Sequence, residues 1–244
     1  MRSIFLLLII SLLTNCSVSG QITDPKATEV HHPVPKVVKP GDGTAPPSDA
    51  IVLFDGKNFN EWTSIKDNAP VKWTLKDSAM TVLGGSGNIK TKRQFADVQL
   101  HLEFRTPAVV KGKGQLRGNS GVFLQERYEV QVLDNHENGT YPNGQAGSVY
   151  KQYIPLVNAC KKPGEWQTYD IIYTAPKFNK DGIRVSAGRL TVLQNNILVQ
   201  NNIEIQGTTE YIGLPKNIAH GKASIMLQDH GDLVSYRNVW IREL

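Results

Sequence analysis

The sequence has 244 residues, 40% of them hydrophobic, and a formal net charge of +5 at pH 7. This length and hydrophobic content allow one large domain or two small ones with a sizeable core. The basic residues are scattered, apart from a short cluster between Lys111 and Arg117, and they do not alternate with aromatic residues as in nucleic-acid-binding modules. We therefore expect no nucleic-acid function.

The first residues have the pattern of an export signal. Arg2 provides a basic start, and residues 4–13 form an apolar run that is too short to span a membrane as a helix. Residues 1–15 are therefore predicted to be a signal peptide, and the mature protein is expected outside the cytoplasm.

Cys16 follows this segment in the sequence Leu-Thr-Asn-Cys, which resembles the signal of bacterial lipoproteins. In that signal the cysteine is lipidated and becomes the first mature residue. We predict lipidation of Cys16, attachment to a membrane through this lipid anchor, and a location in the periplasm or at the outer membrane or cell surface. Asn15 departs from the Gly, Ala or Ser usual at its position, and the alternative is an ordinary signal peptide with an incidental cysteine.

Residues 16–48 are rich in Pro, Val, Lys and Gly and show no apolar periodicity, which predicts a flexible, extended tether. From Ile51 onward, short β-type runs alternate with turn signals, and no segment has a sustained helical period. Residues 49–244 are therefore predicted to form one all-β domain, a jelly-roll sandwich of two antiparallel sheets with few short helices. The expected strands are 51–54, 71–75, 80–83, 98–105, 121–125, 128–133, 166–174, 190–194, 197–199, 223–227 and 234–242.

Residues 129–134 (Glu-Val-Gln-Val-Leu-Asp) place polar side chains inside one expected strand. With a two-residue period, Glu129 and Gln131 share one face of the strand. Asp134 falls on the other face unless a β-bulge re-aims it. The alternative is a half-exposed strand without a role in chemistry.

Two other segments repeat this pattern. Glu103 and Arg105 share one face of the expected strand 98–105, and Gln228 and His230 have the same two-residue spacing in residues 227–231. If these strands are neighbours, their polar faces form one site. His230 is the best candidate for a general base, because imidazole accepts a proton near pH 7 and Asp229 or a carboxylate of a neighbouring strand could orient it. The alternative is a solvated or structural histidine.

Residues 129–134 also resemble the Glu-x-Asp-x-x-Glu motif of laminarinase-like retaining endoglycosidases, in which two carboxylates share the chemistry. Gln131 stands at the middle position of that motif and cannot carry its negative charge. Asp134 is shorter than the glutamate expected as the acid. The two-carboxylate mechanism is therefore not expected here.

A second resemblance extends from about Val52 to Leu244 and consists of several blocks in a fixed order. The blocks are Leu53-Phe54-Asp55-Gly56-Lys57-Asn58 with Trp62, Glu103-Phe104-Arg105, Asn119-Ser120-Gly121-Val122-Phe123, residues 129–134, Gly164-Glu165-Trp166-Gln167, and Leu227-Gln228-Asp229-His230-Gly231 through Tyr236-Arg237-Asn238. Together they resemble the 3-keto-disaccharide hydrolase family, formerly a domain of unknown function.

The resemblance implies a concanavalin A-like jelly roll that acts on glycosides already oxidised at C3 of the sugar. A 3-keto group acidifies the C2 proton, so that a base can remove it and the C1 substituent leaves by elimination. Water adds afterwards, in this enzyme or in a partner hydratase, and a partner oxidoreductase would supply the substrate. The alternative function is a non-catalytic carbohydrate-binding jelly roll at the cell surface.

The resemblance and the strand pattern together suggest roles for individual residues. We expect His230 or Glu129 to be the base, and Arg105, Gln131 or a bound divalent cation to stabilise the enolate. The residues expected to bind or orient the substrate are Glu103, Asn119, Asp134, Gln228 and Arg237.

Some of these residues have plainer readings. Arg237 could instead form a structural ion pair with a carboxylate such as Glu103. The Asn119–Gly121 segment could serve only a turn. No zinc-type ligand cluster occurs in the sequence, so no cofactor is assigned, and the ligands of any oxygen-bound cation are unknown.

Overall fold

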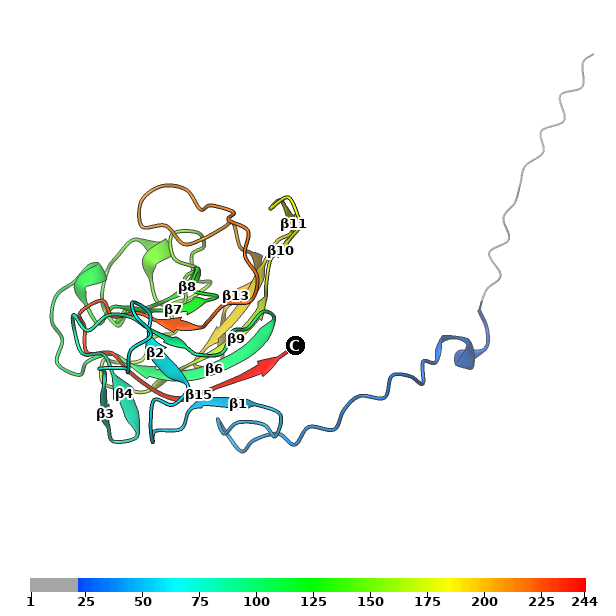
Figure 1. Cartoon of the computed structure of the whole chain (residues 1–244), viewed down its shortest axis with the longest axis horizontal. Coiled ribbons are helices and arrows are strands. Elements are labelled where there is room, and N and C mark those ends of the chain that lie inside the picture. Colours follow the sequence, from blue (N-terminus) through cyan, green and yellow to red (C-terminus); the bar gives the residue numbers. More distant parts are fainter. Residues whose placement is uncertain (1–21) are drawn as a thin grey trace, which may run out of the picture. The chain divides into compact units, whose positions relative to one another are not determined.

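A computed structural model describes residues 22–244 (Figure 1). The predicted signal peptide at residues 1–15 and the predicted lipidation site Cys16 lie outside the described residues. Residues Val38–Leu244 form one compact unit, and the chain before Val38 is a separate unit. In that first unit, residues 22–37 are exposed and contain one short 3-10 helix, η1 (Pro25–Thr28). Within residues 22–244, no helix has the length and apolar character needed to cross a membrane.

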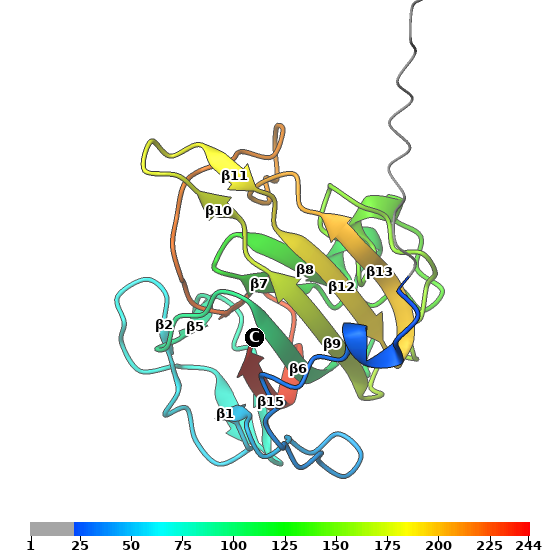
Figure 2. The same ribbon diagram turned by 90° about the vertical axis from the view of Figure 1, so that its right-hand side faces the viewer.

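The larger of two sheets has eight strands, and Figure 2 shows β13, β12, β9, β6 and β15 side by side in it. Seven of the strands follow the order β13-β12-β9-β6-β15-β4-β3. The eighth, β1, lies off this path and pairs with β15. All of these pairings are antiparallel. The strands are β1 (Ile51–Phe54), β3 (Thr74–Lys76), β4 (Ala79–Thr81), β6 (Val98–Arg105), β9 (Gln167–Thr174), β12 (Arg189–Gln194), β13 (Ile197–Glu204) and β15 (Ser235–Glu243).

The smaller sheet has five antiparallel strands in the order β2-β5-β14-β7-β8. They are β2 (Trp62–Ser64), β5 (Ile89–Thr91), β14 (Met226–Leu227), β7 (Ser120–Leu124) and β8 (Tyr128–Val132). A separate two-stranded ribbon joins β10 (Lys177–Phe178) to β11 (Arg184–Ser186). Two more short 3-10 helices, η2 (Gly114–Leu116) and η3 (Pro142–Gly144), lie in loops.

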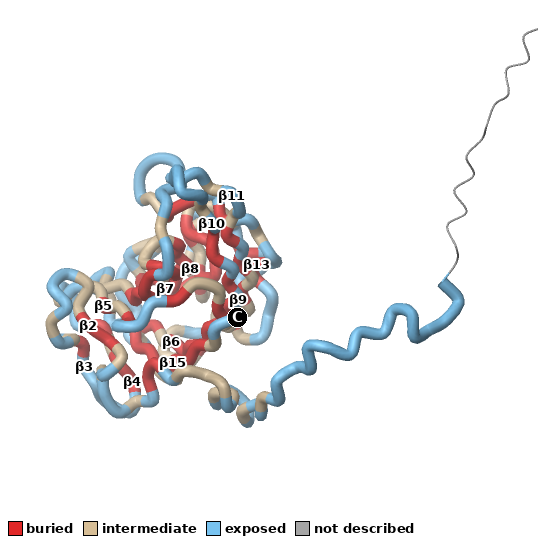
Figure 3. The backbone as a smooth tube through the Cα atoms, turned by 45° about the vertical axis from the view of Figure 1, so that its right-hand side comes forward, coloured by how far each residue is buried: buried red, intermediate tan, exposed pale blue. Residues whose placement is uncertain are grey.

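The two sheets enclose the core, and buried residues are concentrated in their central strands (Figure 3). In β6, Leu102 and Phe104 are completely buried, and in β8 the same holds for Val130 and Val132. Because side chains alternate along a strand, the polar residues between them point away from the core. The polar face of β6 therefore belongs to the outer face of the larger sheet, and that of β8 to the outer face of the smaller sheet.

This architecture confirms the predicted fold class, an all-β jelly-roll sandwich of two antiparallel sheets with few short helices. Residues 38–48, which the composition assigns to the tether, pack against the larger sheet. Thr44 carries most of this contact: its hydroxyl donates to Glu103 Oε1 (3.1 Å), and its carbonyl accepts from Asn238 Nδ2 (2.9 Å) and Trp240 Nε1 (3.1 Å). One outer face of the sandwich is thus partly covered by the chain's own N-terminal segment.

Candidate active site

A cavity of about 610 Å³ lies over the outer face of the smaller sheet, a volume suited to a small ligand. Strands β7 and β8 form its floor, and loops form its walls. The lining residues are Gln115, Leu116, Asn119, Phe123, Glu129, Gln131, Tyr141, Tyr150, Thr209, Tyr211, Gln228 and His230. The cavity therefore brings together five of the residues predicted from the sequence, namely Asn119, Glu129, Gln131, Gln228 and His230.

Glu129 is buried on the cavity side of β8, with 4% of its surface exposed. Its backbone N–H donates to Thr209 Oγ1 at 3.0 Å, but its carboxyl group forms no hydrogen bond or ion pair with any residue in the range 22–244. Burial without a compensating partner raises the pKa of Glu129 to about 8. Near neutral pH the carboxyl group is therefore mainly protonated and can donate a proton.

Gln131 is the next cavity-facing residue of β8, and a neighbouring glutamine fixes its amide. Gln131 Nε2 donates to Gln115 Oε1 at 2.9 Å, while Gln115 Nε2 donates to Thr140 Oγ1 (2.9 Å) and to the Gly144 carbonyl (2.8 Å). Gln131 Oε1 is buried and has no partner among the described residues. An unpaired buried acceptor is costly, so a hydroxyl or amide donor of a ligand would be bound there favourably.

Gln228 adds a second acceptor of the same kind. Its backbone is held to β7, because its N–H donates to the Gly121 carbonyl (3.0 Å) and its carbonyl accepts from Ser120 Oγ (2.6 Å). Its side-chain Oε1 is buried without a partner in the described part of the chain. Asn119 lies nearby and is oriented by a bond from its Nδ2 to the Gln115 carbonyl (2.7 Å). The cavity is thus equipped to accept hydrogen bonds from a polyhydroxylated ligand.

His230 lines the cavity from the turn after β14 and is exposed. The expected orientation by Asp229 is not present, because the Asp229 carboxylate instead accepts from the backbone N–H groups of Gly87 (2.8 Å) and Gly231 (2.9 Å). Asp229 therefore shapes the turn. The imidazole has no hydrogen bond to another residue between positions 22 and 244 and is available to a ligand.

Two tyrosines in loops complete the cavity wall, and sequence reasoning missed them. Tyr141 and Tyr150 are joined by a hydrogen bond between their hydroxyl groups, 2.7 Å apart. The ammonium group of Lys151 lies 5.8 and 5.6 Å from the centres of these two rings and 4.4 Å from that of Tyr211. Neither the tyrosines nor Gln115 belong to a periodic strand pattern, so no sequence signal pointed to them.

Three predicted site residues are elsewhere. Glu103, Arg105 and Arg237 lie on β6 and β15 of the larger sheet, with the core between them and the cavity. Arg237 forms an ion pair with Glu103, with Nε and Nη2 at 2.7 and 2.6 Å from Oε2, which is the structural alternative considered for this arginine. The guanidinium groups of Arg105 and Arg237 both stack on Trp166, 4.7 and 4.1 Å from the ring centre.

The ionisation of Glu103 fits this structural role. Burial opposes its charge, but hydrogen bonds from Asn238 and Arg237 outweigh burial and lower the pKa of Glu103. Its carboxylate is thus held in the charged form by Arg237, Asn238 and Thr44. These residues fasten the strands and the N-terminal segment together, and the structure does not bring them into the candidate site.

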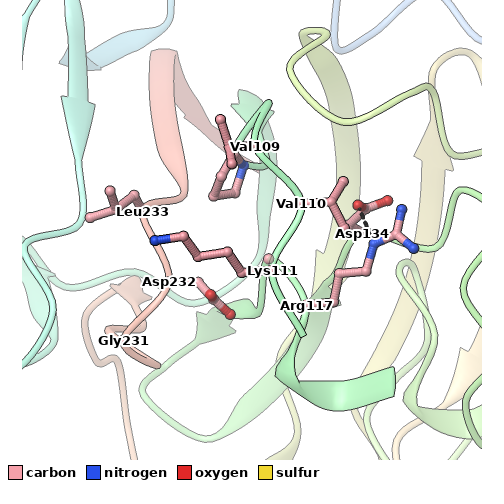
Figure 4. A pocket seen from close by; sticks show the side chains of 10 residues that line it. Val109, Val110, Lys111, Arg117, Asp134, Gly231, Asp232 and Leu233 are labelled. Atoms are coloured by element: carbon pink, nitrogen blue, oxygen red, sulfur yellow. Dashed lines mark hydrogen bonds and ion pairs between the residues drawn. The ribbon is translucent and has the colours of Figure 1, made fainter. Parts of the chain in front are cut away.

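Asp134 is also outside the cavity. Strand β8 ends at Val132, and its pairing with β7 has no register shift, so the β-bulge that could re-aim Asp134 is not present. The Asp134 carboxylate accepts from Arg117 Nε (2.7 Å) and from the His136 N–H (3.0 Å). Figure 4 shows this pair at the edge of a second cavity of about 360 Å³, which Val109, Val110 and Leu233 also line.

The described residues offer no set of side chains that can be assigned as metal ligands. Within residues 22–244, no group of three or more His, Cys, Asp or Glu side chains is placed to hold a metal ion. The divalent cation considered from the sequence stays a prediction without assigned ligands.

Comparisons with known proteins agree with the ordered motifs. Residues 49–242 match the family model described as the 3-keto-alpha-glucoside-1,2-lyase-like domain. A 3-keto-disaccharide hydrolase of Bacteroides thetaiotaomicron is 29% identical over 248 residues. The match covers 80% of this chain and 78% of the relative.

Solved structures agree as well. One from Parabacteroides distasonis, provisionally named a glycosyl hydrolase, is 50% identical with a TM-score of 0.87, covering 91% of this chain and 97% of that chain. Another from the same species, named in the same way, is 25% identical with a TM-score of 0.56, covering 80% of this chain and 99% of that chain. The chain therefore belongs to the 3-keto-alpha-glucoside-1,2-lyase-like domain family.

Proposed function

We propose that this protein is an enzyme that cleaves glycosides oxidised at C3 of the sugar, by removing the C2 proton and eliminating the C1 substituent. The observation that carries the proposal is the buried carboxyl group of Glu129, which has no partner among residues 22–244 and faces a cavity that His230 also lines. An acid and a base in one cavity are what such an elimination requires. Family membership and the 3-keto-disaccharide hydrolase relative support the same substrate class.

In the proposed reaction, His230 is the base. The exposed imidazole takes the proton from C2, which the neighbouring C3 carbonyl makes acidic, and the electron pair of the C–H bond moves into an enolate. When the carbonyl re-forms, this electron pair makes the C1–C2 double bond, and the bond from C1 to the glycosidic oxygen breaks. Glu129 gives its proton to that leaving oxygen. The products are an unsaturated 3-keto sugar and the free alcohol, and later addition of water gives net hydrolysis.

The glutamines are proposed to hold the sugar. Gln131 Oε1 and Gln228 Oε1 are acceptors without partners in the described chain, and they would accept hydrogen bonds from sugar hydroxyl groups. Asn119 lines the same cavity and would position the ring. Because an elimination forms no covalent glycosyl intermediate, the reaction needs no carboxylate at position 131. Gln131 can therefore serve as a binding residue.

The test compares two substrates that differ only at C3, 4-nitrophenyl 3-keto-glucoside and 4-nitrophenyl glucoside. We expect release of nitrophenol from the first and none from the second. Proton NMR in heavy water should show the C2 proton signal disappearing, with deuterium entering C2 by exchange in the substrate before release or when water adds to the unsaturated product. Absence of release, with measurable binding of glycans by calorimetry, would instead identify a non-catalytic carbohydrate-binding jelly roll.

We also propose that the protein is exported and anchored by lipid on Cys16, in the periplasm or at the outer membrane or cell surface. The signal-like residues 1–15 and the adjoining cysteine support this proposal. A partner oxidoreductase would then supply the 3-keto glycoside, and a hydratase would consume the unsaturated product. Cys16→Ser should move the protein from the membrane fraction to the soluble fraction, while Cys160→Ser, a change at the second cysteine, should not. Equal fractionation of both variants would refute the anchor.

A further inference from the structure

The elimination proposed above places negative charge on the C3 oxygen while the C2 proton is being removed. Such a developing oxyanion needs a hydrogen-bond donor placed in advance, and this is commonly the largest electrostatic contribution to catalysis. The following inference rests on the proposed function and concerns the group that supplies this donor.

The residues expected to act on the enolate do not offer a donor to the cavity. Arg105 lies on the larger sheet, on the far side of the core. Gln131 uses its Nε2 on Gln115 Oε1 and the Gly144 carbonyl, at 2.9 and 3.4 Å, so its free atom is an acceptor. Gln228 has a buried Oε1 without a partner as well, but its Nε2 also forms no hydrogen bond with residues 22–244. The amide of Gln131, held by its neighbours, thus suits a sugar hydroxyl group and not a carbonyl oxygen.

The Tyr141–Tyr150 pair does offer a donor. Both residues line the cavity, and their hydroxyl oxygens are 2.7 Å apart. A hydroxyl pair has two protons, and only one of them can lie between the two oxygens. Whichever tyrosine donates to the other, the hydroxyl proton of the accepting tyrosine is left for a ligand. When the accepting tyrosine donates this proton to a ligand, the hydrogen bond between the two tyrosines becomes stronger.

We propose that the Tyr141–Tyr150 hydroxyl pair donates the hydrogen bond that stabilises the C3 oxygen as it becomes an enolate. Both tyrosines would then be catalytic residues that no strand pattern had indicated. No proton leaves the pair in this step, because the C2 proton goes to His230.

The surroundings of the pair favour donation. Burial, followed by the bond to Tyr141, raises the pKa of Tyr150, so that its hydroxyl stays protonated and does not act as a base. Lys151 places a positive charge 5.6 Å from the Tyr150 ring centre, which favours negative charge nearby. This ammonium group is itself fixed by a hydrogen bond to the Tyr211 carbonyl.

Tyr141 is positioned by close contact with a glycine. A Cβ atom at Gly144 would lie 2.0 Å from Tyr141 Cε2, so only glycine lets the ring lie flat against the chain at this point. The Gly144 carbonyl also accepts from Gln115 Nε2, the residue that fixes the Gln131 amide. One loop segment therefore orients both the hydroxyl pair and the amide.

The experiment uses the full chain with Tyr141→Phe, Tyr150→Phe and the double variant, assayed on 4-nitrophenyl 3-keto-glucoside. Tyr153→Phe is the matched control, since Tyr153 does not line the cavity and its hydroxyl has no hydrogen bond to any described residue. We expect the double variant to lose about 10²- to 10³-fold in kcat, the usual cost of an oxyanion donor, with KM changed less than about threefold. Deuterium exchange at C2 should slow equally, and Tyr153→Phe should keep the wild-type kcat.

A double variant that keeps the wild-type kcat would overturn the inference, and so would a loss confined to KM, which would indicate ground-state binding only. In either case the proposed function would stand, because the wild-type protein still cleaves the 3-keto substrate. Failure of the wild-type protein to release nitrophenol would refute the proposed function itself. Thermal unfolding of each variant confirms that the fold is retained.

Discussion

Gly121 of strand β7 pairs with Gln131 of β8 and lies diagonal to Glu129, and a Cβ atom at Gly121 would be 2.5 Å from Glu129 Oε1. The backbone at Gly121 does not have the positive φ that favours glycine, so the requirement here is one of space. The missing side chain leaves room for a buried carboxyl group. This explains a glycine in the Asn119–Gly121 motif that turn chemistry does not explain.

Gly121→Ala is therefore expected to impair catalysis. The added methyl group must displace the Glu129 carboxyl or the backbone, at a cost of about 1–3 kcal/mol in stability, and it moves the proposed proton donor. Turnover of an alkyl 3-keto-glucoside should fall by about tenfold or more, since small displacements of catalytic groups are costly. Gly139→Ala, where a Cβ meets nothing within 4 Å, is the control and should change neither stability nor rate. Full activity of Gly121→Ala would mean that the carboxyl position is not critical.

Glu129→Gln and His230→Ala should differ in their dependence on the leaving group. Nitrophenol leaves without help, whereas an alkoxide needs a proton, so the loss in Glu129→Gln should be about 10²-fold or more with an alkyl aglycone and much smaller with nitrophenyl. The base acts before the leaving group departs, so His230→Ala should lose about 10²-fold or more with both substrates. The test is to measure steady-state kcat/KM for each of the two variants with each of the two substrates. Equal losses in Glu129→Gln for both aglycones would contradict its role as proton donor.

Cleavage of a substrate with an alkyl leaving group should become slower at alkaline pH. Burial raises the pKa of Glu129 to about 8, and only its protonated form can donate. With the alkyl substrate, kcat/KM of the wild-type protein should therefore decline as the pH rises through about 8, because kcat/KM reports ionisation in the free enzyme. The nitrophenyl substrate should lack this decline. If kcat/KM instead rises through this range, Glu129 acts as a base.

The sequence predicted the strands and their faces better than it predicted the site. Alternation placed Glu129 and Gln131 correctly on one face, because a buried strand enforces a two-residue period. The same alternation in Glu103 and Arg105 is equally clear, but a pattern within one strand does not reveal which sheet the strand joins. Strand β6 pairs with β9 and β15, so its polar face is turned away from that of β8.

Other differences have similar causes. Strands β2 and β5 were not expected, because three-residue strands are too short for a period to be visible. The residues expected at 223–227 contribute only β14 (Met226–Leu227). Tyr141 and Tyr150 reach the cavity from loops, where the fold and not the local sequence decides which side chains meet.

Stability should depend on pH through Glu129. Its folded-state pKa of about 8 lies above the ordinary value of 4.5, so the folded protein retains a proton that the unfolded chain loses. Stability therefore declines as the pH rises above about 4.5 and levels off above about 8, by a few kcal/mol, since each pKa unit corresponds to about 1.4 kcal/mol. Glu129→Gln removes this decline and should unfold at a higher denaturant concentration than the wild-type protein at pH 9. Identical pH dependence of the two midpoints would show that the carboxyl group is not buried as described.

Glu103→Gln should separate stability from catalysis. Glu103 accepts from Arg237, Asn238 and Thr44, and these contacts fasten β15 and the N-terminal segment to β6. Replacing the carboxylate weakens a partly buried ion pair, so the free energy of unfolding should fall by about 1–3 kcal/mol. Since the core separates these residues from the cavity, kcat/KM for the 3-keto substrate should stay within about twofold of the wild-type value, far from the loss expected of a catalytic group. Denaturant titration measures the free energy of unfolding, and initial rates on the same preparation measure kcat/KM. A large loss of rate at unchanged stability would show that Glu103 takes part in catalysis.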